Sequence, residues 1–84
     1  MIDRQLQYVE WAAFVDELDE AREHLEDLIK NLKEDLDYGE PELRAELGHV
    51  FAHLNRAWRR SARGLDDAEW EWASQFPDDL TPMV

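Results

Sequence analysis

The sequence of 84 residues has no cysteine and only three prolines and three glycines. Without cysteine the chain can form no disulfide, no thiolate metal site and no cysteine nucleophile, and a cysteine-free composition suits the reducing cytoplasm. The sequence also lacks an apolar run of membrane-spanning length and a basic leader segment after Met1. We therefore expect a soluble, cytoplasmic protein without a membrane partner.

Positive charge is scarce as well. The chain has 9 Lys+Arg against 21 Asp+Glu, which gives a formal net charge of −12. Such a surface repels nucleic acid and anionic lipid and attracts basic partners, so direct nucleic-acid binding is not expected. Four tryptophans supply large areas to bury, and they separate this sequence from disordered acidic tails.

The motifs of catalysis are missing too. Ser61, Ser74 and Thr81 are the only aliphatic hydroxyl residues, and none lies in a nucleophile-elbow motif. Three isolated glycines cannot form a phosphate-binding loop, and adjacent acids such as Asp16 and Glu17 point apart on a helix. We predict neither enzymatic activity nor a cofactor.

What the sequence does contain is a helical pattern. Neither proline nor glycine precedes Gly39, and apolar residues recur at alternating spacings of three and four from Trp11 to Leu32. This heptad seam predicts one long helix over residues 4–36. Gly39 is expected to close that helix in the left-handed conformation, and Pro41 to open the next one.

The same periodicity resumes in the second half of the chain and predicts a helix over residues 41–63. Asp66 and Glu69 have the spacing of a capping box, which predicts a short third helix over residues 67–76. Residues 77–84 show no periodicity and are expected to form an extended tail.

These elements predict a single all-α domain, residues 1–84, built on an antiparallel helical hairpin. With the turn centred near Gly39, residue i of the first helix should lie beside about residue 79 − i of the second, since both helices rise equally per residue.

The two flanks of the predicted seam differ. One flank is mostly apolar along both helices, whereas the other is polar throughout. A third apolar row is typical of bundle helices and must be covered. We expect the short third helix to cover only the end near Val15, Trp58 and Leu65, and a homodimer to complete a helical bundle. The predicted interface residues are Ile29, Leu36, Phe51, Trp58 and Trp70.

The two tryptophans of the third helix, Trp70 and Trp72, project to nearly opposite sides and cannot both face one partner. Two interpretations of Trp70 stay open. It packs as a staple against Leu65, or it is an exposed anchor for another protein.

Four arginines form a stripe on the second helix, at the level of acids on the first: Arg56, Arg59, Arg60 and Arg63. We expect Arg60 to meet Glu17 and Arg56 to point outward. On the opposite flank, Arg22 is expected to stack on Trp58. Internal charge pairing is favoured, and an anion-binding site is the alternative.

The candidate metal ligands are few: His24, Glu46, His49 and His53. Glu46 and His49 form a Glu-x-x-His sequence, which resembles a motif of ferritin-like di-iron proteins. Leu47 and Val50, however, hold the inward positions of that turn, and no spacing motif demands a zinc site. His24 and His53 lie at nearly the same level of the polar flank and are expected to be neighbours, with Glu20 or Glu23 as possible further ligands. We nevertheless predict solvated histidines and no bound metal.

Three functions are compatible with these features. The leading one is a small acidic cytoplasmic protein–protein interaction module, an adaptor or regulatory subunit, that binds a protein partner or itself. The alternative is an acidic inhibitor, a nucleic-acid mimic or immunity-type protein that occupies a basic groove of its partner; its size and charge are similar to those of colicin immunity proteins by analogy alone. A helical metal-binding protein is the third.

Overall fold

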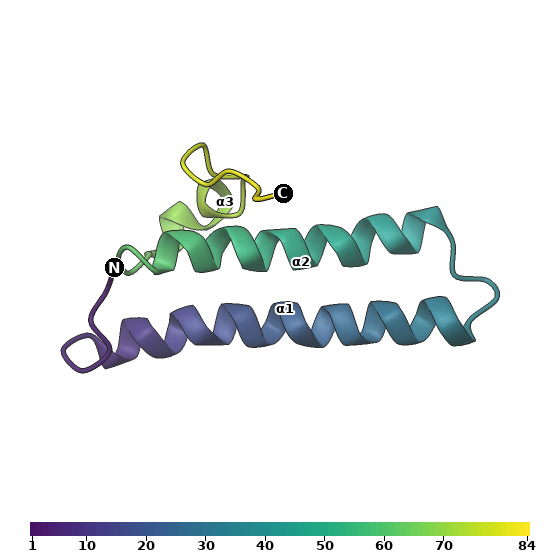
Figure 1. Ribbon diagram of the computed structural model, residues 1–84, viewed down its shortest axis with the longest axis horizontal. Coiled ribbons are helices and arrows are strands. Elements are labelled where there is room, and N and C mark those ends of the chain that lie inside the picture. Colours follow the sequence, from purple (N-terminus) through teal and green to yellow (C-terminus); the bar gives the residue numbers. More distant parts are fainter.

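The computed structural model describes residues 1–84 and consists of helices and loops, without strands. Two long helices, α1 (Tyr8–Glu34) and α2 (Glu40–Arg60), lie antiparallel and pack against each other (Figure 1). A 3-10 turn, η1 (Asp67–Glu69), leads into the single turn of α3 (Trp70–Ala73). α3 packs on α2 alone, on the side that faces away from α1 (Figure 1). The predicted all-α hairpin with a short third helix is confirmed.

α1 begins later than predicted because Asp3 organises a separate turn ahead of it. The Asp3 carboxylate accepts the backbone N–H groups of Gln5 and Leu6 at 2.9 and 2.8 Å. Ile2, just before this turn, is buried, and its N–H donates to the Ser61 carbonyl at 2.7 Å. The N-terminal segment is therefore attached to the C-terminal end of α2.

The connection between α1 and α2 differs from the prediction at Gly39. Gly39 has φ −123° and ψ −167°, and no residue of the chain has a positive φ. Gly39 is instead the N-cap of α2, where its N–H donates to Glu42 Oε2 at 2.9 Å. Asp35 makes the reversal, since its carboxylate accepts the Asp37 N–H at 2.9 Å. The turn is centred near Asp37, so each residue of α1 lies opposite a residue of α2 nearer the loop than predicted.

α2 ends at Arg60 instead of residue 63, because its last turn tightens and the chain then passes close to α1. The N–H of Ala62 donates to the Arg59 carbonyl three residues back, at 3.1 Å, which is the tighter 3-10 pattern. A Cβ atom on Gly64 would lie 3.1 Å from Cγ of Glu10, which makes glycine the residue that permits this approach.

The third helical segment covers fewer residues than the predicted 67–76. The capping box is present, and the Asp66 N–H donates to Glu69 Oε1 at 3.3 Å. The helix stops early because the Ser74 hydroxyl donates to the Trp70 carbonyl at 2.8 Å and closes the turn.

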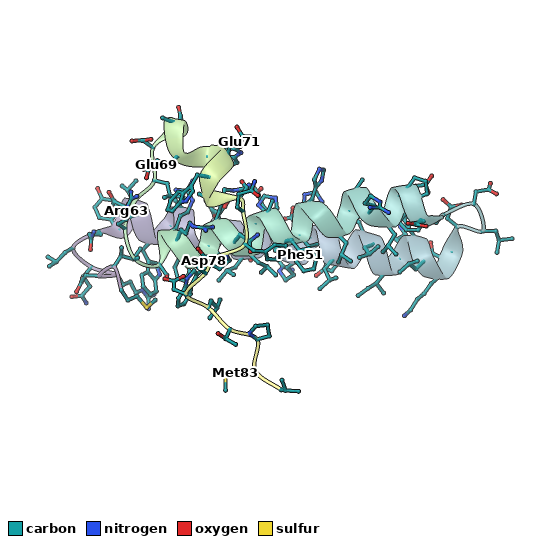
Figure 2. The ribbon with its side chains drawn as sticks, turned by 90° about the horizontal axis from the view of Figure 1, so that it is seen from above. Phe51, Arg63, Glu69, Glu71, Asp78 and Met83 are labelled. Carbon is teal, nitrogen blue, oxygen red and sulfur yellow. The ribbon has the colours of Figure 1, made fainter.

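The apolar core is thin for a chain of this size. None of the four tryptophans is buried. None of the helices has both the length and the apolar character needed to cross a membrane. The tail, residues 77–84, forms no helix. It lies on the same side of α2 as α3 (Figure 1), crosses over α2 and extends away from α3, with Met83 near its end (Figure 2). The buried apolar residues are Ile2, Ala21, Leu28, Val50, Ala57 and Ala73.

Candidate functional site

Large apolar side chains are exposed along one side of both long helices, and we term this surface the apolar face. Their exposed fractions lie between 37% and 54%. Helical periodicity places the members from each helix on one side of it. A contiguous apolar surface of this kind marks interaction sites in soluble proteins. The apolar face consists of Val15, Leu18, Leu25, Ile29 and Leu32 of α1 and Phe51 and Leu54 of α2.

Three leucines of the apolar face, Leu18, Leu25 and Leu32, belong to the seam that was predicted to be the hairpin core. In the structure two other residues of that seam, Ala21 and Leu28, are buried as predicted. The contact between the helices is therefore centred on one half of the predicted seam, the half next to the buried Glu17 of the polar flank. The exposed half of the seam enlarges the apolar face beyond the predicted row.

The polar flank encloses a buried ion pair. Arg56 Nε donates to Glu17 Oε2 at 2.6 Å, and both side chains are less than one tenth exposed. Arg60 Nε lies 3.9 Å from the same oxygen, in agreement with the predicted pairing. The prediction that Arg56 points outward is wrong, because Glu17 and the Ser74 hydroxyl, 2.7 Å from Arg56 Nη1, together hold the guanidinium inside.

The predicted interface residues do not form one surface. Ile29 and Phe51 belong to the apolar face, whereas Leu36 is fully exposed beyond the end of α1. Trp58 is half-buried, and its indole N–H donates to Asp79 Oδ1 in the tail at 2.8 Å. Trp70, 46% exposed, lies on the polar side against Arg56.

α3 was predicted to cover the end of the apolar flank near Val15, Trp58 and Leu65. In the structure its Trp72 lines a cavity with Trp58 and Leu65, whereas Val15 stays 37% exposed. Arginines of α2 hold α3 in this place. The Arg56 guanidinium lies 3.9 Å from the Trp70 ring centroid, and that of Arg59 lies 4.5 Å from the Trp72 centroid. Trp70 therefore contacts Arg56, which neither interpretation of this residue predicted, and it remains 46% exposed.

Two further arginines, Arg63 and Arg22, form ion pairs. Arg63 attaches the segment that leads into α3, and Arg22 pairs within α1. Arg63 pairs with Glu69, and its hydrogen bond, with that of the Asp66 N–H, lowers the pKa of Glu69 to about 2. The same pairing raises the pKa of Arg63. The prediction that Arg22 stacks on Trp58 is wrong. This arginine pairs within α1, at 3.1 Å from Glu26 and 3.5 Å from Asp19.

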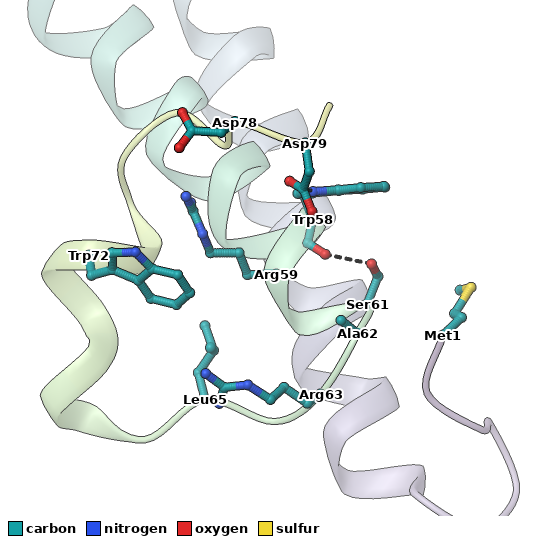
Figure 3. Close-up of a pocket in the computed structure, with 10 residues that line it drawn as sticks. All are labelled: Met1, Trp58, Arg59, Ser61, Ala62, Arg63, Leu65, Trp72, Asp78 and Asp79. Atoms are coloured by element: carbon teal, nitrogen blue, oxygen red, sulfur yellow. Dashed lines mark hydrogen bonds between the residues drawn. The ribbon is translucent and has the colours of Figure 1, made fainter. Parts of the chain in front are cut away.

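A cavity of about 720 Å³ lies where the end of α2, α3 and the tail converge (Figure 3). Arg59 extends into this region and donates through Nη1 to the carbonyls of Ala73 and Gln75. Because these bonds occupy the guanidinium, it holds α3 in place and is not a free anion-binding group. The cavity is lined by Met1, Trp58, Arg59, Ser61, Ala62, Arg63, Leu65, Trp72, Asp78 and Asp79.

A second group of side chains, all with atoms that can bind a metal ion, lies between the helices on the polar flank. His24 of α1 meets Glu46 of α2, with Nδ1 3.2 Å from Oε2. The ring of His49 lies edge-on to that of His24, with centroids 5.0 Å apart. One donor atom each from His24, Glu46 and His49 lie within 4.8 Å of one another. We term these three residues the histidine cluster.

His53, the remaining candidate ligand, is near the cluster but otherwise engaged. Its ring stacks on His24 with centroids 5.3 Å apart. Its Nδ1 lies 3.0 Å from Arg56 Nη2 and 3.4 Å from Glu17 Oε1. Its Nε2 faces Glu20 Oε2 at 3.4 Å. Three of the four candidate ligands thus come together, and His53 belongs to the buried ion-pair network.

Comparison with known proteins brings no assignment: no family model, curated protein or solved structure matches the chain. The candidate sites therefore stand on their geometry. The sequence interpretation missed the Glu17–Arg56 pair, although one signal for it existed. Arg56 precedes Arg60 by one helical turn, so a glutamate that reaches one can reach the other.

Proposed function

We propose that the protein is a protein–protein interaction module that associates with a second copy of itself through the apolar face, so that two hairpins form a four-helix bundle. The observation that supports this function is the row of half-exposed leucines on the apolar face. Its cytoplasmic setting is inferred from the cysteine-free sequence and stays a prediction.

The surface area of the single chain supports the proposal. A folded monomer of 10.0 kDa has an accessible surface of about 5,200 Å² by the usual scaling with mass. This chain exposes 6552 Å². The excess exceeds the roughly 800 Å² that one partner contributes to a standard interface. The radius of gyration points the same way, since it is 14.6 Å against about 12 Å for a compact chain of this length.

The shape of the apolar face favours a second copy as the occupant. Both helices contribute to it, whereas α3 packs on α2 on the side facing away from α1 (Figure 1). Helices with a third apolar row are the components of four-helix bundles. Two like faces can pair by a two-fold axis, the commonest symmetry of oligomers, in which each hairpin covers the other.

Sedimentation equilibrium at micromolar concentration tests the proposal. We expect twice the 10.0 kDa of one chain, and a clean 10.0 kDa species at all accessible concentrations would overturn it. Salt provides a second test. Two chains of charge −12 repel each other, so added salt should strengthen the dimer. A complex with a basic groove, as in the acidic-inhibitor alternative, would weaken with salt instead.

A further inference from the structure

We propose that the histidine cluster, His24, Glu46 and His49, is a binding site for one divalent transition-metal ion of the zinc class. The site joins α1 to α2 on the polar flank. It is separate from the apolar face and does not depend on self-association.

The distances between the donor atoms fit such an ion. Tetrahedral zinc with ligand bonds of about 2.0–2.1 Å separates neighbouring donor atoms by about 3.4 Å. His24 Nδ1 and Glu46 Oε2 are 3.2 Å apart, so they already have the separation of two ligands of one ion. A hydrogen bond between these two atoms requires one proton between them. A metal ion would replace that proton.

The third donor completes the set with a small movement. Glu46 and His49 are three residues apart on α2, so they project from the same side of the helix. All three donors lie within 4.8 Å of one another. His49 is exposed, so its imidazole can rotate toward the other two without disturbing the core.

Two imidazoles and one carboxylate are a donor set that zinc uses in proteins. Imidazole nitrogen suits zinc, copper, iron and nickel, whereas calcium and magnesium prefer oxygen alone. Three protein ligands leave a fourth position for water, as in open zinc sites. A cavity of about 360 Å³ next to His24 and His49 gives that position access to solvent.

The neighbouring arginine does not oppose the ion. Arg56 also lines this cavity, but Glu17 neutralises it at 2.6 Å. Glu20, on the far side of His53, adds negative charge nearby. The positive charge of Arg56 is therefore already balanced by Glu17, and it does not repel a metal ion at the histidine cluster.

The test titrates the full-length protein with Zn²⁺ against a chromophoric chelator, and separately with Co²⁺, whose visible absorption reports tetrahedral nitrogen and oxygen ligation. We expect one ion per chain. The variants His24→Ala, Glu46→Gln and His49→Ala should each weaken binding by about 100-fold or more, beyond the effect of a lost outer-shell partner. Bound Zn²⁺ should also raise the melting temperature.

Glu23→Gln is the matched control, because it removes one negative charge from an exposed position next to His24. It should leave the affinity unchanged. Equal weakening in Glu23→Gln and Glu46→Gln would overturn the proposal, since it would show a diffuse counter-ion. Binding that survives His49→Ala, whose exposed side chain is not needed for folding, would overturn it as well, as would fewer than one ion per chain. Sedimentation of the same samples reports self-association independently.

Discussion

The Arg56 guanidinium donates to the Glu17 carboxylate at 2.6 Å inside the contact between α1 and α2, on the flank that the heptad pattern predicts to be polar and exposed. The two side chains are 6% and 8% exposed. A buried ion pair stabilises a fold only while both partners are present, because either one alone is an uncompensated charge away from water.

Replacing Glu17 with glutamine should therefore be strongly destabilising. Arg56 would remain buried without a counter-ion, and we expect the free energy of unfolding to fall by about 3–5 kcal/mol. Urea denaturation at fixed protein concentration measures it. The control Glu23→Gln removes the same charge from an exposed position of α1 and should change the free energy by less than about 0.5 kcal/mol. Similar losses in the two variants would contradict a specific role for the pair.

A charge in the middle of the apolar face should separate the dimer. Ile29→Glu places a carboxylate in the proposed interface, where it must either lose its hydration or keep the copies apart. We expect this variant to sediment at 10.0 kDa, the mass of one chain. Lys30→Gln makes the same change in net charge one position away and should sediment as the parent protein does. Dimers in both variants would place the interface elsewhere.

Arg59→Lys should loosen α3 although it keeps the charge. The Arg59 guanidinium donates to carbonyls of Ala73 and Gln75 and stacks on Trp72, and a single ammonium group cannot reproduce that geometry. We expect α3 to lose about 1–3 kcal/mol of attachment, measured by amide hydrogen exchange in α3.

The control for Arg59 is Arg44→Lys, in an exposed pair with Glu40 on α2. This substitution should change the free energy of α3 attachment by less than about 0.5 kcal/mol. Unchanged exchange in α3 of the Arg59→Lys variant would show that other contacts hold the segment.

Attachment of η1 and α3 should also depend on pH through Glu69. The pKa of Glu69 in the folded protein is about 2, below its ordinary value of 4.5, because Arg63 and the Asp66 N–H favour the ionised form. A lowered pKa contributes stability that is fully present above about pH 4.5 and is lost as the pH falls toward 2. Tryptophan fluorescence should therefore separate the parent from Glu69→Gln above pH 4.5.

The two titration curves should converge as the pH approaches 2. Glu71→Gln, at an exposed position of α3, should follow the parent curve throughout. A difference between the parent and Glu69→Gln that persists unchanged down to pH 2 would contradict this assignment.

Several features of the fold could be predicted from local sequence, and their limits have local causes. The long helices follow from apolar spacing without interruption by proline or glycine, and only their ends shifted by a few residues. The capping box of Asp66 and Glu69 was correct because it depends on two residues three positions apart. The prediction for Gly39 was wrong because this residue does not close α1. It is the N-cap of α2, where its N–H donates to the Glu42 carboxylate and an extended conformation is required.

The candidate sites were less predictable, because they depend on how the two helices are rotated and aligned. The predicted register made His53 the neighbour of His24, and their rings do stack, with centroids 5.3 Å apart. The same register placed Glu46 and His49 nearer the loop than His24. A turn centred on Asp37 brought His24 to Glu46 instead. This shift in register between α1 and α2 cannot be recognised from the sequence of either helix alone, since the apolar periodicity of each helix is the same in both registers.

The sequence by itself determined an acidic, all-helical hairpin with more apolar surface than two helices can cover, because periodicity and composition are local properties. The tertiary structure decided which flank was buried. Arg56 could enter the interior only because Glu17 and the Ser74 hydroxyl, from distant parts of the chain, satisfied its donors. Once that polar network occupied the contact between the helices, Leu18, Leu25 and Leu32 of the predicted seam were left at the surface.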